Sequence, residues 1–171
     1  MLFRAACACV LALALTAPLA GRQQAAVTVP PSAPGAAWFG TWQLVPPAPA
    51  SRFEPPPYKN VTLRIEPWQD GLRVVYDMVR ARGGITHVEW QGRFDGRDYP
   101  VQGMEYYLTN AYRPIDDRSY EIIIKVDGRV AANAIAAVSP DRATLTVTTV
   151  ERDASGRTLR TTANYRRQPA L

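Results

Sequence analysis

The amino-acid sequence predicts an all-β fold, an antiparallel up-and-down β-barrel of about 8–10 strands with no long helix after the N-terminal segment. Apolar and polar residues alternate along most of the chain after residue 58, which is the period of a half-buried strand. Turn sequences rich in Gly, Pro and Asp separate these runs at short, regular intervals. An open sheet of so many short strands would expose two edges, and closure into a barrel removes both.

The first predicted strand, residues 38–45, is an aromatic and apolar run between two proline-rich stretches. Proline fixes its own φ and cannot donate a ladder hydrogen bond, so only this run is expected to be regular between residues 27 and 57. Residues 46–57 are therefore predicted to be an extended connection to the next strand.

Further strands are predicted wherever alternation is bounded by turn residues. Their ranges are 61–66, 72–78, 85–94, 99–102, 105–112, 120–126, 130–138, 145–149 and 159–167. Asp95-Gly96 and Asp127-Gly128 are dipeptides favoured in hairpin turns, and residues 114–117 are predicted to form another turn. Connections this short favour a meander, so the first strand is expected to pair with the last.

The N-terminal segment has the composition of a secretory signal peptide. Arg4 precedes an uncharged stretch, residues 5–20, which is shorter than the roughly 20 residues that span a bilayer. We predict cleavage between residues 20 and 26, a flexible Pro/Ala-rich tether over 21–37 and one barrel domain over 38–168. The expected location is the bacterial periplasm or the medium, because an exported domain without disulfides is typical there.

Charge and cysteine content exclude several kinds of site. Cys7 and Cys9 both lie in the segment expected to be removed, so the mature chain would contain no disulfide, thiolate zinc site or cysteine nucleophile. The net charge of +5 comes almost wholly from arginines spread singly along the chain and often beside acids. Nucleic-acid binders cluster their basic residues, so we expect no nucleic-acid partner. We also expect a monomer with no stable membrane insertion.

Gly40-Thr41-Trp42 in the first predicted strand resembles the G-x-W signature of the lipocalin and calycin group. Together with residues 51–53, 70–72, 99–101, 115–118 and 139–141, it resembles an uncharacterised exported bacterial lipocalin-like family over residues 38–168. The resemblance implies that Trp42 closes one end of the barrel beneath an arginine of the last strand. Alternation makes Arg167 the best match for that arginine, so Gly40, Trp42 and Arg167 are the expected structural signature.

His87 is the only histidine, and it alternates with Glu89 on one face while Trp90 points to the other. A His/Glu pair on one strand could bind a metal or act as acid and base, whereas a solvated strand face is the simpler interpretation. Without a second histidine we expect no metal, no cofactor and no catalytic residue. Asp116 and Asp117 are adjacent and point to opposite sides of an extended chain, which indicates a turn rather than a catalytic pair.

Small side chains line one face of the predicted strand 130–138, which bears on whether the barrel contains a cavity. Ala132, Ala134 and Ala136 are predicted to share a face with Val130 and Val138, so this wall of the barrel would be thin. A thin wall leaves either an apolar pocket or room for large residues from opposite strands. The candidate cavity residues are Tyr76, Met78, Trp90, Tyr106, Leu108, Ala132, Ala134 and Ala136.

Three functions are compatible with these observations. The first is binding of a small, partly apolar molecule inside the barrel. The alternative is a non-enzymatic interaction module with a filled interior, which would present loops such as 80–85 and 104–107 to a protein partner. The third is an enzyme centred on His87 and Glu89, for which the sequence offers neither a nucleophile nor an orienting residue.

Overall fold

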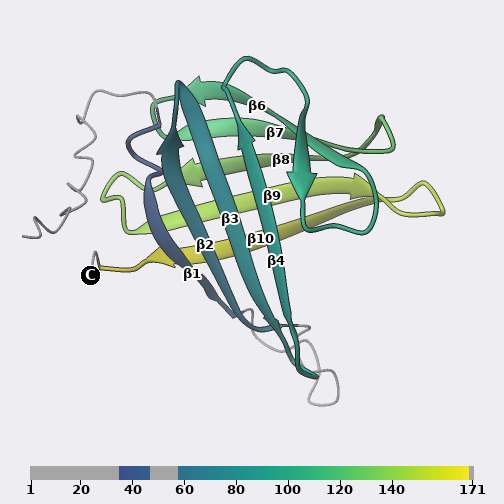
Figure 1. The fold of residues 1–171 in the computed structure, drawn as a ribbon, viewed down its shortest axis with the longest axis horizontal. Helices are drawn as coiled ribbons and strands as arrows, with labels where there is room; N and C mark the ends of the chain where they lie inside the picture. Colours follow the sequence, from purple (N-terminus) through teal and green to yellow (C-terminus); the bar gives the residue numbers. More distant parts are fainter. Residues whose placement is uncertain (1–34, 47–57, 170–171) are drawn as a thin grey trace, which may run out of the picture.

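The computed structural model describes residues 35–46 and 58–169, and these form one closed barrel of antiparallel strands (Figure 1). The strands are β1 (Gly40–Val45), β2 (Tyr58–Trp68), β3 (Gly71–Arg80), β4 (Ile85–Gly92), β5 (Tyr99–Gln102), β6 (Leu108–Asp116), β7 (Ser119–Val126), β8 (Arg129–Val138), β9 (Thr144–Arg152) and β10 (Thr158–Arg167). Each strand pairs with its neighbours in sequence, and β1 pairs with β10. The predicted all-β, up-and-down barrel is therefore confirmed.

The register of β1 explains how the barrel closes. Trp42 lies opposite Arg167 of β10 on one side and opposite Leu63 of β2 on the other. All three side chains have the same parity and point to the inside of the barrel. Closure therefore brings the first and last strands together around Trp42.

The connections alternate between the two ends of the barrel. The end that contains Trp42, Trp38 and the β6–β7 and β8–β9 turns is called the sealed end below. The other end carries the β3–β4, β7–β8 and β9–β10 hairpins and the β5–β6 connection, and is called the open end. In Figure 1 the C-terminus and β1 lie on the left, at the sealed end, and the β7–β8 and β9–β10 hairpins lie on the right.

The two predicted hairpin dipeptides have different structures. Asp127 and Gly128 have φ values of 48° and 76°, the left-handed pair that a tight hairpin between β7 and β8 requires. Asp95 and Gly96 instead lie in a longer connection between β4 and β5, so the prediction of a tight hairpin there is wrong. The backbone N–H of Gly96 donates to the carbonyl of Tyr112 at 3.1 Å, which holds this connection against β6.

Several strand boundaries differ from the predicted ones. β6 begins at Leu108 rather than at residue 105, and it runs through Pro114 to Asp116, where a turn was predicted. Pro114 is tolerated because β5 pairs with β6 only at Thr109 and Asn110, so Pro114 needs no donor on that side. At the N-terminal side β1 begins at Gly40, and Trp38 belongs to a turn in which its N–H donates to the carbonyl of Gly35 at 2.9 Å.

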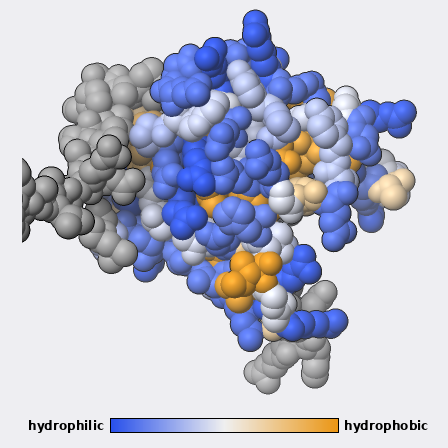
Figure 2. Space-filling view, in the orientation of Figure 1, coloured by the Kyte–Doolittle hydropathy of each residue, from blue (hydrophilic) through white to orange (hydrophobic). Residues whose placement is uncertain are grey.

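The expected signal peptide, its cleavage region and residues 21–34 of the expected tether lie outside the described residues. Residues 35–37 are described, and Ala37 is buried in the hydrophobic core. Folded structure therefore begins before Trp38. Figure 2 shows that the near face of the barrel is largely hydrophilic, with hydrophobic surface beside β5 and near the lower ends of β3 and β4.

Candidate functional site

The sealed end is built around Trp42 and Arg167. The Trp42 side chain has no solvent exposure, and the guanidinium carbon of Arg167 lies 4.0 Å from the centre of its ring. Gly40 makes room for this arrangement, because a Cβ atom at this position would lie 2.7 Å from Nη1 of Arg167. Gly40 also has a φ of 136°, which residues with a side chain rarely adopt. The glycine of the G-x-W signature is thus required by the arginine that covers the tryptophan.

Arg167 is held by backbone carbonyls as well as by the ring of Trp42. Its Nη1 donates to the carbonyl of Phe39 at 2.5 Å, Nη2 donates to that of Ala37 at 2.6 Å, and Nε donates to that of Arg142 at 2.6 Å. Burial, with the nearby positive charge of Arg142, lowers the pKa of Arg167 from its ordinary value. These contacts join β10 to the segment before β1 and to the β8–β9 turn, so the role of Arg167 is structural.

Aromatic rings form a packed layer inside the sealed end. Trp38 contacts the edge of Tyr120 with ring centroids 3.7 Å apart, and its Nε1 donates to the carbonyl of Arg118 at 2.8 Å. Trp90 stacks on Tyr112 with a centroid distance of 4.0 Å, and Tyr112 in turn lies 5.2 Å from Tyr120. The sealed half of the barrel is therefore filled by large rings contributed by several strands.

Four tyrosines from different strands place hydroxyl groups in the interior, and they are called the inner tyrosine cluster: Tyr76 (β3), Tyr112 (β6), Tyr120 (β7) and Tyr165 (β10). Burial raises the pKa of Tyr76, Tyr112 and Tyr120 well above the ordinary value, and it raises the pKa of Tyr165 to about 12. Charge on Tyr165 or Tyr112 would raise the pKa of Tyr76 further, so these hydroxyls lie within electrostatic reach of one another. All four are neutral hydrogen-bonding groups at physiological pH.

Asn110 adds an unusual polar group to the same space. It lies opposite Tyr99 and Ile124 in the β-ladder, so its side chain points inward. The Asn110 side chain lies close enough to the Tyr112 hydroxyl to oppose part of the rise that burial causes in its pKa, but the buried Oδ1 of Asn110 has no hydrogen-bond partner among the described residues. Buried polar atoms without hydrogen-bond partners are rare in native proteins, so the environment of this oxygen is exceptional.

Burial of the inward-facing side chains changes along the barrel axis. Near the sealed end they are buried, and these residues are Trp42, Leu63, Ile65, Val74, Trp90, Val138 and Leu145. Toward the open end Val61 and Ala132 are buried, but most inward-facing residues keep solvent-accessible surface, and these are Leu44, Tyr76, Met78, Leu108, Ile124, Val147 and Ala163. Leu159, at the start of β10, is 40% exposed although its parity is inward. The inner wall is thus more accessible toward the open end than near Trp42.

Most of the predicted cavity residues face the barrel interior, but at different levels of burial. Tyr76, Met78 and Leu108 are partly exposed, whereas Trp90 is buried against Tyr112. Ala132, Ala134 and Ala136 are also buried, and the latter two belong to the core cluster. Large side chains of other strands therefore cover much of the thin wall formed by β8.

Two residues of the predicted wall lie elsewhere. Tyr106 is 49% exposed in the β5–β6 connection at the open end, because β6 begins only at Leu108. Val130 is 58% exposed and lies opposite Lys125, although simple alternation placed it on the face of Val138. The register shifts between Ile124 and Lys125, and this bulge reverses the parity of β8 at its start.

His87 and Glu89 lie on the outer face of β4 within a network of charged side chains. Arg73 binds Glu89 through two hydrogen bonds of 2.9 and 2.7 Å, and Nδ1 of His87 lies 2.7 Å from Oδ1 of Asp77. The hydrogen bond from Arg73 is the main reason why the pKa of Glu89 is lowered, and Glu89 raises the pKa of Arg73 in return. Val75 lies on the same outer face and is fully buried. The charged side chains therefore have a structural role, because they cover this apolar residue.

His87 is 53% exposed at the side chain, and its Nε2 lies 3.9 Å from Oε2 of Glu89. Among the described residues, no group of three or more His, Cys, Asp or Glu side chains is placed to bind a metal ion. Residues 35–46 and 58–169 include no helix that is long and apolar enough to cross a membrane.

The outer surface of the sealed end also carries a groove of about 630 Å³. Its walls include Arg142, Arg166, Arg167 and Gln168. The guanidinium of Arg167 already donates hydrogen bonds to three backbone carbonyls. Asp141 accepts hydrogen bonds from Ser139 and from the backbone of Ala143. The groove therefore has less hydrogen-bonding capacity than its arginine content indicates, and the barrel interior is the stronger candidate site.

Sequence reasoning missed the polar groups of the interior. Asn110, Tyr112, Tyr120 and Tyr165 were absent from the predicted cavity set. A signal was present, because alternation from Leu108 places Asn110 and Tyr112 on the same inward face. An asparagine in the apolar phase of a strand is itself a sign of a special site.

Comparison with models of known protein families finds no match to this sequence, and comparison with curated proteins finds no similar protein.

Proposed function

We propose that this protein is a non-enzymatic binding protein whose barrel takes up a small, partly apolar molecule through the open end. The observation that carries this proposal is the difference in burial along the barrel axis. Inward-facing apolar residues are packed near Trp42 but accessible near Leu159 and Ala163. Apolar walls with a few polar groups are typical of small-molecule sites in barrels.

The architecture supports the same proposal. A closed antiparallel barrel with Gly40, Trp42 and Arg167 at one end resembles the lipocalin arrangement, in which one end is sealed and the other admits a ligand. We further propose export to the periplasm or the medium, on the basis of Arg4 and the uncharged stretch 5–20. The mass of the protein recovered outside the cytoplasm would test this, since cleavage should fall between residues 20 and 26.

Binding can be tested with an apolar dye whose fluorescence rises on transfer from water. Ala163→Trp would place an indole in the accessible half of the interior and should weaken dye binding about tenfold or more. Thr162→Trp is the matched control, because Thr162 is exposed on the outer face of the same strand. Failure of the wild-type protein to bind the dye, or equal binding by both variants, would contradict the proposal. Native mass spectrometry of protein purified from its own source could then identify a bound ligand.

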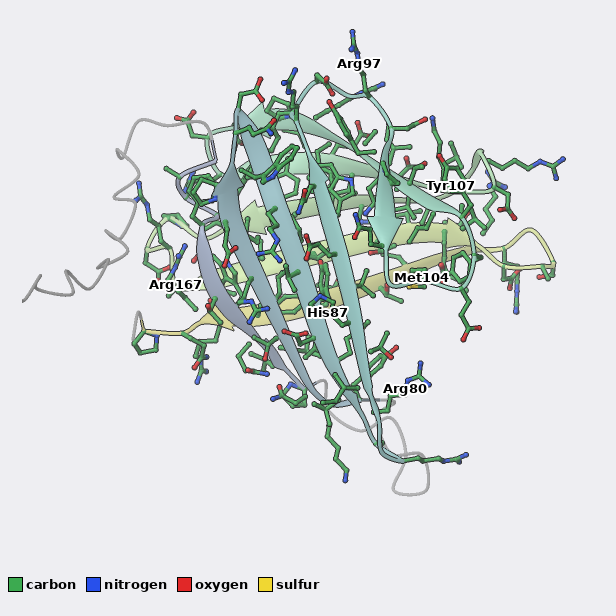
Figure 3. The ribbon with its side chains drawn as sticks, viewed as in Figure 1. Arg80, His87, Arg97, Met104, Tyr107 and Arg167 are labelled. Atoms are coloured by element: carbon green, nitrogen blue, oxygen red, sulfur yellow. The ribbon has the colours of Figure 1, made fainter. Side chains whose placement is uncertain are left out.

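A second candidate function is supported by the rim of the open end. Ile85, the first residue of β4, is 73% exposed, and Tyr107 in the β5–β6 connection is 61% exposed, and both border the opening. The N–H of Asp127 donates to the carbonyl of Tyr107 at 3.0 Å, which holds this loop beside the β7–β8 hairpin. Figure 3 places Arg80, Met104 and Tyr107 toward this end and Arg167 at the opposite end. Such exposed aromatic and apolar residues are suited to a protein partner.

The two functions can be separated by one pair of variants. Ile85→Ser and Tyr107→Ser should remove capture of a protein partner from a native extract and leave dye binding unchanged if the rim is an interaction surface. Ala163→Trp should have the reverse effect if the interior is the site.

A further inference from the structure

The inner tyrosine cluster and Asn110 bear on which kind of molecule the barrel accepts. Resting on the proposed function, we propose that these residues bind the uncharged, hydrogen-bonding end of an amphiphilic ligand, such as a long-chain alcohol or primary amide. The apolar chain of the ligand would extend toward the open end along Met78, Leu108, Val147 and Ala163.

The first observation is the unpartnered oxygen of Asn110. Its Oδ1 is buried and accepts no hydrogen bond from a described residue, and Asn110 shares the inward face of β6 with Tyr112. An unsatisfied buried acceptor is costly, and a hydroxyl or amide N–H from a ligand would satisfy it. The ligand should therefore carry a hydrogen-bond donor at its polar end.

The second observation is that the hydroxyls of the inner tyrosine cluster lie close to one another, and that Tyr112 shares the inward face of β6 with Asn110. Tyr76 and Tyr112 lie within electrostatic reach of each other, and Tyr112 packs 5.2 Å from Tyr120 between ring centroids. Burial raises the pKa of all three, so they remain protonated and can donate hydrogen bonds. The polar end of the ligand should accordingly include an acceptor as well as a donor, as alcohols and primary amides do.

The third observation is the distribution of charge on the inner face of the described strands. Charged residues of inward parity are Arg80, Arg129 and Glu151 near the open end and Arg167 at the sealed end. Arg167 stacks on Trp42 and donates hydrogen bonds to three carbonyls, so its guanidinium is not available to a ligand. A carboxylate at the depth of Asn110 would lack a positive partner, which disfavours a charged ligand.

The fourth observation is the change from polar to apolar lining. Met78, Leu108, Val147 and Ala163 are inward-facing and partly exposed, and they lie on four different strands. This leaves apolar surface uncovered between the cluster and the open end. An alkyl chain that covers it would gain hydrophobic free energy while its polar end reaches Asn110.

The test is competition against the apolar dye by three ligands that share one alkyl chain and end in a hydroxyl, a primary amide or a carboxylate. We expect the alcohol and the amide to displace the dye at concentrations about tenfold lower than the ionised carboxylate. Asn110→Leu and Tyr76→Phe should each remove most of this preference, measured within each variant as the ratio of the carboxylate and alcohol concentrations that displace the dye. Tyr99→Phe is the matched control, because Tyr99 also faces inward but its hydroxyl already donates to Asp95 of the β4–β5 connection, at 2.9 Å.

The outcomes distinguish this inference from the function on which it rests. If the dye binds and the carboxylate competes as well as the alcohol, the assignment of an uncharged polar end is wrong and the binding function stands. The same conclusion follows if Asn110→Leu and Tyr76→Phe behave like Tyr99→Phe. If neither the dye nor any of the three ligands binds the wild-type protein, both proposals fail.

Discussion

The guanidinium of Arg167 covers the ring of Trp42 at 4.0 Å, and the same two residues are direct partners in the ladder between β10 and β1. One pair thus joins the first and last strands of the barrel and closes its sealed end. Because Arg167 also donates to the carbonyls of Phe39, Ala37 and Arg142, its removal would affect the segment before β1 and the β8–β9 turn as well as β1.

Arg167→Ala is expected to lower the free energy of unfolding by about 2–4 kcal/mol, because it removes the cation–π contact and leaves partly buried carbonyls without donors. Urea denaturation followed by tryptophan fluorescence would measure the change. Arg166→Ala is the control, since Arg166 is exposed on the outer face, and its effect should stay within about 0.5 kcal/mol. Equal effects of the two substitutions would show that Arg167 does not stabilise the seal.

Gly40→Ala should destabilise the protein by about 1–3 kcal/mol, through a strained φ of 136° and a collision with Arg167. Gly128→Ala separates the effect of the strained φ from that of the collision. Gly128 also has a positive φ, but an added Cβ would meet no atom within 4 Å. Thermal unfolding should therefore show a larger loss for Gly40→Ala, and a similar loss at both positions would mean that the collision is relieved without cost.

The ion pair between Arg73 and Glu89 makes part of the stability dependent on acid pH. The pKa of Glu89 in the folded protein is lowered from 4.5, chiefly by the Arg73 hydrogen bond. The resulting stabilisation is present above the unfolded-state pKa and is lost as the pH falls through the folded-state value. Because Arg73 is partly exposed, we expect a contribution on the order of 1 kcal/mol.

Glu89→Gln should remove this contribution, so that the variant loses less stability than the wild type between neutral pH and pH ~3. Unfolding by urea at a series of pH values would reveal the difference. Glu151→Gln, at an exposed position near the open end, should leave the pH profile unchanged. A parallel decline in wild type and Glu89→Gln would remove the pair as a source of the acid dependence.

Alkaline pH should destabilise the folded protein through ionisation of the inner tyrosine cluster. Tyrosines of the unfolded chain ionise near pH ~10, whereas burial raises the pKa of Tyr76, Tyr112 and Tyr120 well above this and that of Tyr165 to about 12. Stability is therefore retained below the unfolded-state value and falls as the pH rises above it.

Titration followed by tyrosinate absorbance should have two phases, and the second should coincide with the loss of near-ultraviolet circular dichroism. Ionisation of all tyrosines near their ordinary pKa with the fold intact would mean that the cluster is open to water. Tyr112→Phe should reduce the amplitude of the second phase.

Local patterns predicted the fold well but not the ends of its elements. Alternation and turn residues identified the strands and the closure of β1 on β10. The extension of β6 through Pro114 was not predictable, since it depends on how short β5 is. Val130 changed faces because a bulge in the pairing of β7 and β8 shifts the register. Bulges depend on contacts between two strands, which the alternation of one strand does not contain.

The candidate site was predictable only in part. Parity placed Tyr76, Met78 and Leu108 on the inner wall, because side chains alternate with a period of two along any strand. Which inner residues are covered by others depends on the packing of rings from distant strands, such as Trp90 on Tyr112. The sequence therefore predicted an inner wall without predicting which half of it is accessible.

The sequence by itself determined the all-β class and the meander, since these follow from short-range alternation and from the need to remove sheet edges. The resemblance of Gly40-Thr41-Trp42 to the lipocalin signature implied the partner of Trp42, and alternation identified it as Arg167. Only the tertiary structure decided that the alanine wall is largely covered, that Asn110 Oδ1 lacks a partner and that Arg73 and Glu89 form an ion pair. These features depend on distances between side chains far apart in the chain, and such distances arise only when the barrel has closed.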